Sequence, residues 1–442
     1  MRKKIVKSIS SILLFCIICG SVGKLTRYLV TDDTNSYTRI TFHEMYEQKN
    51  IDILFVGSSH CYRSFNPEIL DAELGMNTFN AGSSQQSIDG SYMLIKEAAK
   101  YNDLKHIYLE VYYDVAKETR NNRTDLTSTY IISDYLRPSF DKYNYLLKAS
   151  SPDYYGNSFF VARRNSIELL DLDYINTIVS KKSDDVYKNY AYDNVTFEKE
   201  WYCGKGFVFS SGAVDNWDFF SYNAWPEYSA DNICEDWVNE LDKIIDFCNR
   251  KGIELTLVSA PMSNYLLSGI KNYDEYVAYV NELAKDKNVD YLDFNLCKTE
   301  YFPNDCQLFN DADHMNGLGA ELFSYLFADV VTGKLKMEDI TYNSYQEKLD
   351  SIEPMIFGVA YYNHVNEEGI FDARYCKIVT NAENKMEFCV TYEQSDGNVY
   401  VVKDYTSDIY FQITPETTGR FIIDYKFIAD EDTAGSTEIT VY

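Results

Sequence analysis

Short apolar runs separated by helical segments are the feature of this sequence that most restricts its fold. Runs at 51–56, 77–81 and 106–111 alternate with segments of helical character at 67–74 and 91–101. Strands that are buried on both faces of a parallel sheet have such continuous apolar runs. The order strand, helix, strand, helix, strand therefore predicts an α/β domain built on a parallel sheet.

The same alternation resumes after a long interruption. Residues 114–230 are aromatic and polar with weak periodicity, and we interpret them as an insertion over the edge of the sheet. Beyond them the sequence predicts further helices and strands, at 233–249, 253–259, 273–284, 289–292 and 318–330. We place the whole α/β domain at 31–335.

From about residue 336 the sequence changes character. Roughly seven short β-rich segments follow, with turn residues such as Asp396 and Gly397 between them. Many short strands of this kind predict an all-β sandwich, which we place at 336–442.

The N-terminal residues have the charge layout of a targeting signal. Arg2, Lys3 and Lys4 precede an uncharged, largely apolar stretch at 8–23. A helix of that length spans roughly 24 Å, against roughly 30 Å for a bilayer core, and flanking basic side chains can snorkel to make up the difference. We expect residues 1–30 to be a membrane anchor that leaves the chain on the extracytoplasmic face, or a cleaved signal that leaves it secreted.

Charge and cysteine content narrow the function classes. The net charge of −27 repels phosphate backbones, which argues against nucleic-acid binding. Outside the membrane segment no two of the cysteines have C-x-x-C spacing, so we expect no structural zinc site. Disulfides are permitted outside the cytoplasm, and Cys297/Cys306 and Cys376/Cys389 are spaced as local pairs, with buried free thiols as the alternative.

Gly57-Ser58-Ser59-His60 directly follows the first predicted strand. Active sites of parallel α/β sheets lie at the carboxyl ends of the strands. A serine there, close to a helix N-terminus, has backbone N–H donors and a favourable dipole for developing negative charge. We predict Ser59 as the nucleophile, with a capping serine as the alternative. We interpret His60 as packing or pocket lining.

Asp311-Ala312-Asp313-His314 precedes the last predicted helix of the domain. An Asp three residues before a His on a loop can bind one imidazole nitrogen and leave the other facing the serine. We predict His314 as the general base and Asp311 as the carboxylate that orients it, with Asp313 as the alternative. This chemistry requires neither a metal nor another cofactor.

Gly82 ends the second predicted strand, beside the first. We predict that the N–H groups of Ser59 and Gly82 bind the oxyanion of the reaction, with a simple turn glycine as the alternative for Gly82.

These motifs, in this order, resemble the SGNH (GDSL-like) hydrolase superfamily over about residues 50–332. The resemblance implies a flavodoxin-like three-layer α/β/α fold, with Ser59 as nucleophile, Gly82 as oxyanion donor, His314 as base and Asp311 as its orienter. One departure is that the family's third block offers Gly-x-Asn-Asp, whose Asn completes the oxyanion hole. This chain has Glu110-Val111-Tyr112-Tyr113-Asp114 there, so the resemblance supplies no third donor.

The N-terminal segment, Gly-Ser-Ser-His and Asp-x-x-His-x-Asn-x-x-Gly also resemble membrane-anchored members of that superfamily that acylate cell-envelope polymers. Among them are the alginate O-acetylation proteins and the D-alanine transfer protein of teichoic acids. The resemblance implies a cell-surface polysaccharide or teichoic-acid-like polymer as substrate, and a membrane-bound O-acyltransferase as partner.

The sequence therefore predicts a serine esterase or O-acyltransferase that moves acyl groups, such as acetyl, through an acyl-enzyme on Ser59. The rival hypothesis is a catalytically idle carbohydrate-binding or scaffold protein of an envelope acylation complex. It is supported by the missing Asn and by the β-sandwich, which could bind glycan.

Overall fold

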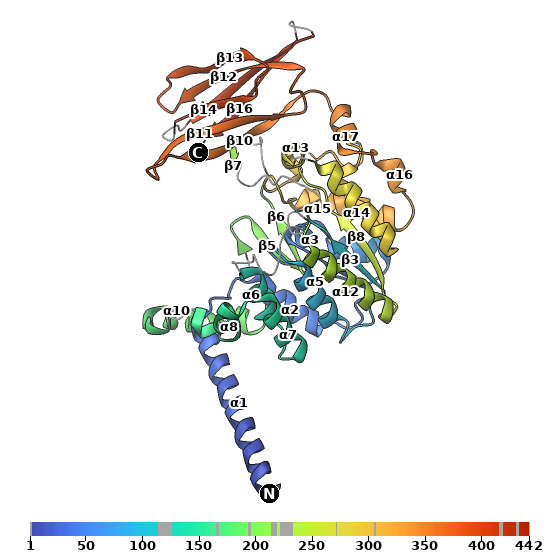
Figure 1. Ribbon diagram of the computed structural model, residues 1–442, viewed down its shortest axis with the longest axis vertical. Coiled ribbons are helices and arrows are strands. Elements are labelled where there is room, and N and C mark those ends of the chain that lie inside the picture. The colour runs from blue at the N-terminus through green and yellow to red at the C-terminus, as the bar shows by residue number, and fades with distance from the viewer. Residues whose placement is uncertain are drawn as a thin grey trace.

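The computed structural model describes residues 2–113, 126–164, 168–192, 196–213, 219–221, 233–270, 272–304, 306–414, 419–429 and 433–441. An α/β domain occupies the middle of the molecule, with a β-sandwich at one end and the long N-terminal helix α1 projecting from the other (Figure 1).

The α/β domain is built on a five-stranded parallel sheet, which confirms the predicted fold class. Its strands lie in the order β2-β1-β3-β8-β9, and their chain order across the sheet is therefore 2-1-3-4-5, as in flavodoxin-like folds. Their bounds are Ile53–Val56 (β1), Thr78–Asn80 (β2), His106–Glu110 (β3), Glu254–Ser259 (β8) and Asp290–Asp293 (β9).

Both faces of this sheet are covered by helices, which explains the continuous apolar runs. Along β1, Leu54 and Val56 face one core and Ile53 and Phe55 face the other. The first core includes side chains from α2 (Tyr37–Glu47), α5 (Ile88–Ala98), α12 (Glu235–Lys251) and α14 (Tyr273–Lys287). The second includes side chains from α3 (Ser59–Ser64), α4 (Pro67–Leu74), α13 (Asn264–Gly269) and α15 (Gly317–Val331).

The insertion is more regular than its weak periodicity predicted. Its described residues form the helices α6 (Thr127–Ser133), α7 (Phe140–Ala149), α8 (Tyr155–Phe159), α9 (Val161–Arg164), α10 (Leu172–Lys182) and α11 (Asp185–Lys188) and the strands β4 (Thr196–Phe197), β5 (Glu200–Gly204), β6 (Phe207–Ser210) and β7 (Phe219–Ser221). The turn between β5 and β6 covers the edge strand β2, because the Asn80 N–H donates to the Lys205 carbonyl (2.9 Å).

The C-terminal strands form two four-stranded sheets that share one core, the predicted sandwich. One sheet has the order β14-β11-β10-β7 and the other β13-β12-β15-β16. The strands are Ile356–Val365 (β10), Phe371–Thr380 (β11), Met386–Gln394 (β12), Val399–Thr406 (β13), Tyr410–Ile413 (β14), Gly419–Phe427 (β15) and Ala434–Val441 (β16). The insertion contributes β7, which pairs in parallel with β10. The sandwich is therefore completed by a segment that the sequence assigned to the other domain.

Two short helices connect the domains. They are α16 (Met337–Ile340) and α17 (Tyr345–Ser351). The fully buried Lys348 of α17 donates to the Asn295 carbonyl (2.8 Å) and to Asn304 Oδ1 (2.6 Å) of the α/β domain.

The N-terminal helix α1 spans Arg2–Val30. Its C-terminal end packs against α9 and α10 of the insertion. Among the residues that the structure describes, no helix combines the length and the apolar character needed to cross a membrane.

Of the two alternatives for the cysteines, local disulfides or buried free thiols, the structure contradicts the first. Cys297, Cys376 and Cys389 are free thiols, the alternative left open above, so neither pair is bridged. The spacing of Cys376 and Cys389 is misleading because Cys376 on β11 faces the core of the sandwich, whereas Cys389 on β12 lies between the core-facing Phe388 and Val390 and faces away from it.

Candidate active site

Ser59 lies where β1 passes into α3, at the carboxyl end of the sheet. Ser58 caps this helix, with its hydroxyl accepting the His60 N–H (3.2 Å). The Ser58 N–H in turn donates to Glu110 Oε2 at the end of β3 (2.7 Å). Gly57 is required for this contact, since a Cβ at that position would lie 2.5 Å from Glu110 Oε2. The local sequence thus fixes Ser59 as the first residue of α3, whose N–H has no intrahelical acceptor.

The structure brings the three predicted catalytic side chains together. Ser59 Oγ lies 2.7 Å from His314 Nε2, across a sequence separation of 255 residues. On the other side of the ring, His314 Nδ1 lies 3.1 Å from each carboxylate oxygen of Asp311. Serine, imidazole and carboxylate therefore form a continuous hydrogen-bonded chain with the geometry of a nucleophile, a base and an orienting acid.

The loop that carries His314 is held in a tight conformation. The Asn310 N–H donates to the His314 carbonyl (2.8 Å), and the Asn316 N–H donates to the Leu308 carbonyl (3.0 Å). Asp311 Oδ1 accepts the backbone N–H groups of Asp313 (2.9 Å) and His314 (2.8 Å). Burial alone would raise the pKa of Asp311, but the hydrogen bonds from His314 and the backbone hold this pKa below its usual range.

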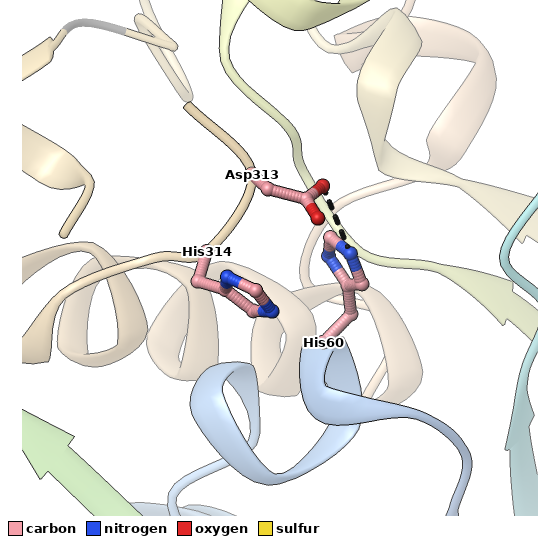
Figure 2. Close-up of side chains that lie close together, drawn as sticks. All are labelled: His60, Asp313 and His314. Atoms are coloured by element: carbon pink, nitrogen blue, oxygen red, sulfur yellow. Dashed lines mark ion pairs between the residues drawn. The ribbon is translucent and has the colours of Figure 1, made fainter. Parts of the chain in front are cut away.

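Asp313, the alternative orienter, binds elsewhere. Its Oδ1 lies 3.1 Å from His60 Nε2 and accepts the Tyr112 hydroxyl (3.1 Å). Figure 2 shows the Asp313 carboxylate turned toward His60, with the ring of His314 beside them. The geometry therefore places Asp311 rather than Asp313 on His314 Nδ1.

The pair formed by His60 and Asp313 is the part of this site that sequence reasoning missed. His60 is only 3% exposed and its ring centroid lies 5.1 Å from that of His314. The signal was present in the second carboxylate of Asp-x-Asp-His and in a histidine next to the nucleophile. Local spacing could not show that these two residues face each other.

The predicted oxyanion donors differ in their surroundings. Ser59 is the partly buried first residue of α3, whereas the Gly82 N–H donates to Asn80 Oδ1 (3.0 Å). Gly82 also packs closely on α3, since a Cβ there would lie 2.9 Å from the Tyr62 nitrogen and 3.0 Å from the Ser58 carbonyl oxygen. An oxyanion role for Gly82 would require its hydrogen bond to Asn80 to be released or shared.

The segment 110–114, at the end of β3, contains no Asn that could act as a third oxyanion donor. Its side chains bind other groups instead: Glu110 accepts the Ser58 N–H, and Tyr112 donates to Asp313. Asp114 lies outside the described residues.

His60, Asp313 and His314 are the one group in the described part of the chain with metal-binding residue types in close proximity. One donor atom from each lies within 4.8 Å of the others. However, the ring nitrogens of His314 face Asp311 and Ser59, and His60 Nε2 faces Asp313. We therefore interpret these contacts as acid–base contacts and assign no metal.

Comparisons with known proteins give structural neighbours only. No family model matches the chain, and no curated protein matches it. Two solved structures are similar to parts of it: a provisionally named acylhydrolase from Bacteroides fragilis and a GDSL-like lipase from Bacteroides thetaiotaomicron. Both are 9% identical in sequence; they cover 66% and 68% of this chain and 95% and 100% of their own chains, with TM-scores of 0.31 and 0.32. TM-scores this low do not establish homology, so the function is proposed from the geometry of the site.

Proposed function

We propose that this protein is a serine esterase or O-acyltransferase that works through an acyl-enzyme on Ser59. The observation that carries the proposal is the 2.7 Å contact between Ser59 Oγ and His314 Nε2, with Asp311 on the opposite ring nitrogen. A serine hydroxyl becomes an effective nucleophile when a positioned base removes its proton, and this contact provides the base.

The proposed reaction has two halves. Ser59 Oγ attacks the acyl carbonyl while its proton passes to His314 Nε2, and the leaving alcohol takes that proton as the ester C–O bond breaks. In the second half an acceptor hydroxyl attacks the acyl-serine, His314 removes its proton, and the proton returns to Ser59 as the enzyme is regenerated. Asp311 keeps the imidazole in the tautomer with the proton on Nδ1. The N-terminus of α3 stabilises the oxyanion.

Water as acceptor gives an esterase, and a sugar hydroxyl gives a transferase. We propose a cell-envelope glycopolymer, polysaccharide or teichoic-acid-like, as the substrate, and a membrane-bound O-acyltransferase as a partner. The proposed location is the extracytoplasmic face of the membrane. Support comes from the basic start of the chain and from α1, which exposes large apolar side chains: Leu14, Phe15, Ile17, Ile18, Val22 and Leu25.

A second candidate function is a non-catalytic carbohydrate-binding or scaffold protein. It is favoured by one specific observation, the Gly82 N–H that donates to Asn80 instead of facing an oxyanion site.

Labelling with a fluorophosphonate probe, followed by peptide mass spectrometry, separates the two candidates. We expect label on Ser59 in the wild-type chain and in the matched control Ser58→Ala, and none in Ser59→Ala. Turnover of an aryl acetate should fall by on the order of 10⁴-fold in Ser59→Ala. Unchanged turnover in that variant would exclude the acyl-enzyme. Mass spectrometry of an added oligosaccharide, which gains an acetyl group only through transfer, then distinguishes transferase from esterase.

A further inference from the structure

The site contains two carboxylates within three residues of each other, and only one of them can orient His314. Asp311 does so at 3.1 Å, while Asp313 Oδ1 lies between the Tyr112 hydroxyl and His60 Nε2, at 3.1 Å from each. The Asp313 side chain is partly buried, at 31% exposure, and the buried imidazole of His60 lies beside it.

His60 is surrounded by groups that favour its protonated form. Burial is the largest single influence and lowers the pKa of His60, but the nearby carboxylates of Asp313, Glu110 on β3 and Asp311 together raise it above its ordinary value. Conversely, burial would raise the pKa of Asp313, and the nearby charge of His60 lowers it. The Tyr112 ring, 4.2 Å from that of His60, and the His314 ring complete the titratable surroundings that the contacts identify.

The position of this pair gives it a consequence for His314. The two imidazole rings are stacked, with centroids 5.1 Å apart and planes inclined by 23° (Figure 2 shows both). A lone carboxylate at Asp313 would favour the protonated form of His314, in which the ring cannot accept a proton from Ser59. When His60 is protonated, its charge cancels that of Asp313, and the 3.1 Å contact holds the carboxylate on the side of His60.

We propose that His60 is a positioning residue for the general base: by pairing with Asp313 it keeps that carboxylate from competing with Asp311 and from favouring the protonated form of His314. The proposal rests on the proposed function, in which His314 acts as the base. It assigns a chemical task to a histidine that does not touch Ser59 Oγ in the described contacts.

The positioning role of His60 can be tested by removing each charge of the pair, alone and together, with His60→Gln, Asp313→Asn and the double variant. We expect His60→Gln to move the acid limb of the pH profile of kcat/KM upward by on the order of one pH unit, because it leaves an unpaired carboxylate beside the base. Asp313→Asn should not move the limb upward, and the double variant should return it toward the wild-type position. The matched control is His43→Gln on α2, whose ring stacks on Tyr190 and which should leave the profile unchanged.

An unmoved acid limb in His60→Gln would overturn the proposal, as would a double variant that keeps the full upward shift. A merely structural role for His60 would lower kcat at all pH values without moving the limb. If His60→Gln does not fold, Tyr112→Phe removes the other donor to Asp313 and should move the limb in the same direction by a smaller amount.

A second readout separates failure of this proposal from failure of the proposed function. NMR titration of the five histidines, with the His314 signal assigned by its loss in His314→Gln, follows the ring without any turnover. The His314 signal should titrate at higher pH in His60→Gln even if Ser59→Ala shows that the chain has no serine-dependent activity. An unshifted His314 signal would overturn the pairing role by itself.

Discussion

Asp313 precedes His314 in the chain, yet its carboxylate lies 3.1 Å from His60 Nε2 and leaves His314 to Asp311. Two adjacent acid–base pairs therefore share one loop. The triad runs from Ser59 through His314 to Asp311, and the second pair supports it from the side of α3 and β3. Because the two carboxylates contact different imidazoles, substitutions of Asp311 and of Asp313 should have different effects.

Asp311→Asn should reduce turnover far more than Asp313→Asn. The Asn side chain would no longer fix the imidazole tautomer, and an equivalent change in a serine triad costs about 10⁴-fold. We expect a loss on the order of 10³- to 10⁴-fold for Asp311→Asn and a much smaller loss for Asp313→Asn. Steady-state kinetics with an aryl acetate, at a pH on the alkaline plateau, measures both losses. Equal losses would contradict the assignment of Asp311 rather than Asp313 as the carboxylate that orients His314.

The pair of His60 and Asp313 should stabilise the fold within a limited pH window. The raised pKa of His60 makes its contribution complete below the ordinary value of about 6.5, and this contribution is lost as pH rises through the folded value. The lowered pKa of Asp313 makes its contribution complete above about 4, and this contribution is lost at lower pH. The pair is therefore most stabilising between about pH 4 and pH 6.5.

A double-mutant cycle with His60→Gln and Asp313→Asn measures this coupling. Urea unfolding should give a coupling energy on the order of 1 to 3 kcal/mol at pH 5.5 and a clearly smaller one at pH 9.5. The same coupling at both pH values would contradict the prediction, because it would mean that the charge of His60 does not change between pH 5.5 and pH 9.5.

Asn80→Ala should destabilise the junction between β2 and the catalytic helix. Its fully buried side chain donates to the carbonyls of Cys61 (2.8 Å) and Phe65 (3.0 Å) and accepts the Gly82 N–H. Truncation leaves these buried groups unpaired, so we expect a loss of roughly 2 to 4 kcal/mol in the free energy of unfolding. Asn77→Ala, which changes a more exposed asparagine just before β2, is the matched control, and a comparable loss there would contradict the reasoning.

Much of this fold could be predicted because burial on two faces leaves a simple imprint on the sequence. The apolar run of β1 and the helix start at Ser59 are local features, and so is the Asp311–His314 spacing. The meeting of Ser59 and His314 follows once both lie at the carboxyl end of one parallel sheet.

The features that could not be predicted depend on contacts between distant segments. The strand β7 belongs to the insertion by sequence but pairs with β10 of the sandwich, and no local periodicity encodes that partner. Likewise, His60 and Asp313 meet only because α3 and the His314 loop pack together. The choice between disulfides and free thiols stayed open for the same reason, since spacing along the chain does not determine the distance between thiols.

Alkylation can test the free thiols directly. Burial raises the pKa values of Cys297 and Cys376 to about 12, so few of these thiols are ionised at pH 8. We expect iodoacetamide to leave both unmodified in the folded chain and to modify both in denaturant without a reductant. The exposed Cys203 is the internal comparison for access in the folded state. Resistance of Cys297 and Cys376 to alkylation after unfolding, removed only by a reductant, would show disulfides instead.

The buried carboxyl of Asp293 should make the α/β domain less stable as pH rises, whereas the contribution of Asp313 is lost as pH falls. Burial raises its pKa to about 6, although the Asn295 N–H (3.0 Å) and the Tyr273 hydroxyl (3.0 Å) donate to it. The folded chain therefore holds this proton more tightly than the unfolded chain, and the contribution of Asp293 to stability falls as pH rises from about 4 to about 6. Asp293→Asn retains an acceptor without the charge, so its stability relative to wild type should increase over this range by up to about 3 kcal/mol.

Asp290→Asn, at the exposed start of the same strand, should show no such trend. Urea unfolding at pH 4.5 and pH 7.5 measures the difference, and a difference between Asp293→Asn and wild type that does not change with pH would show that Asp293 is already ionised at the lower pH.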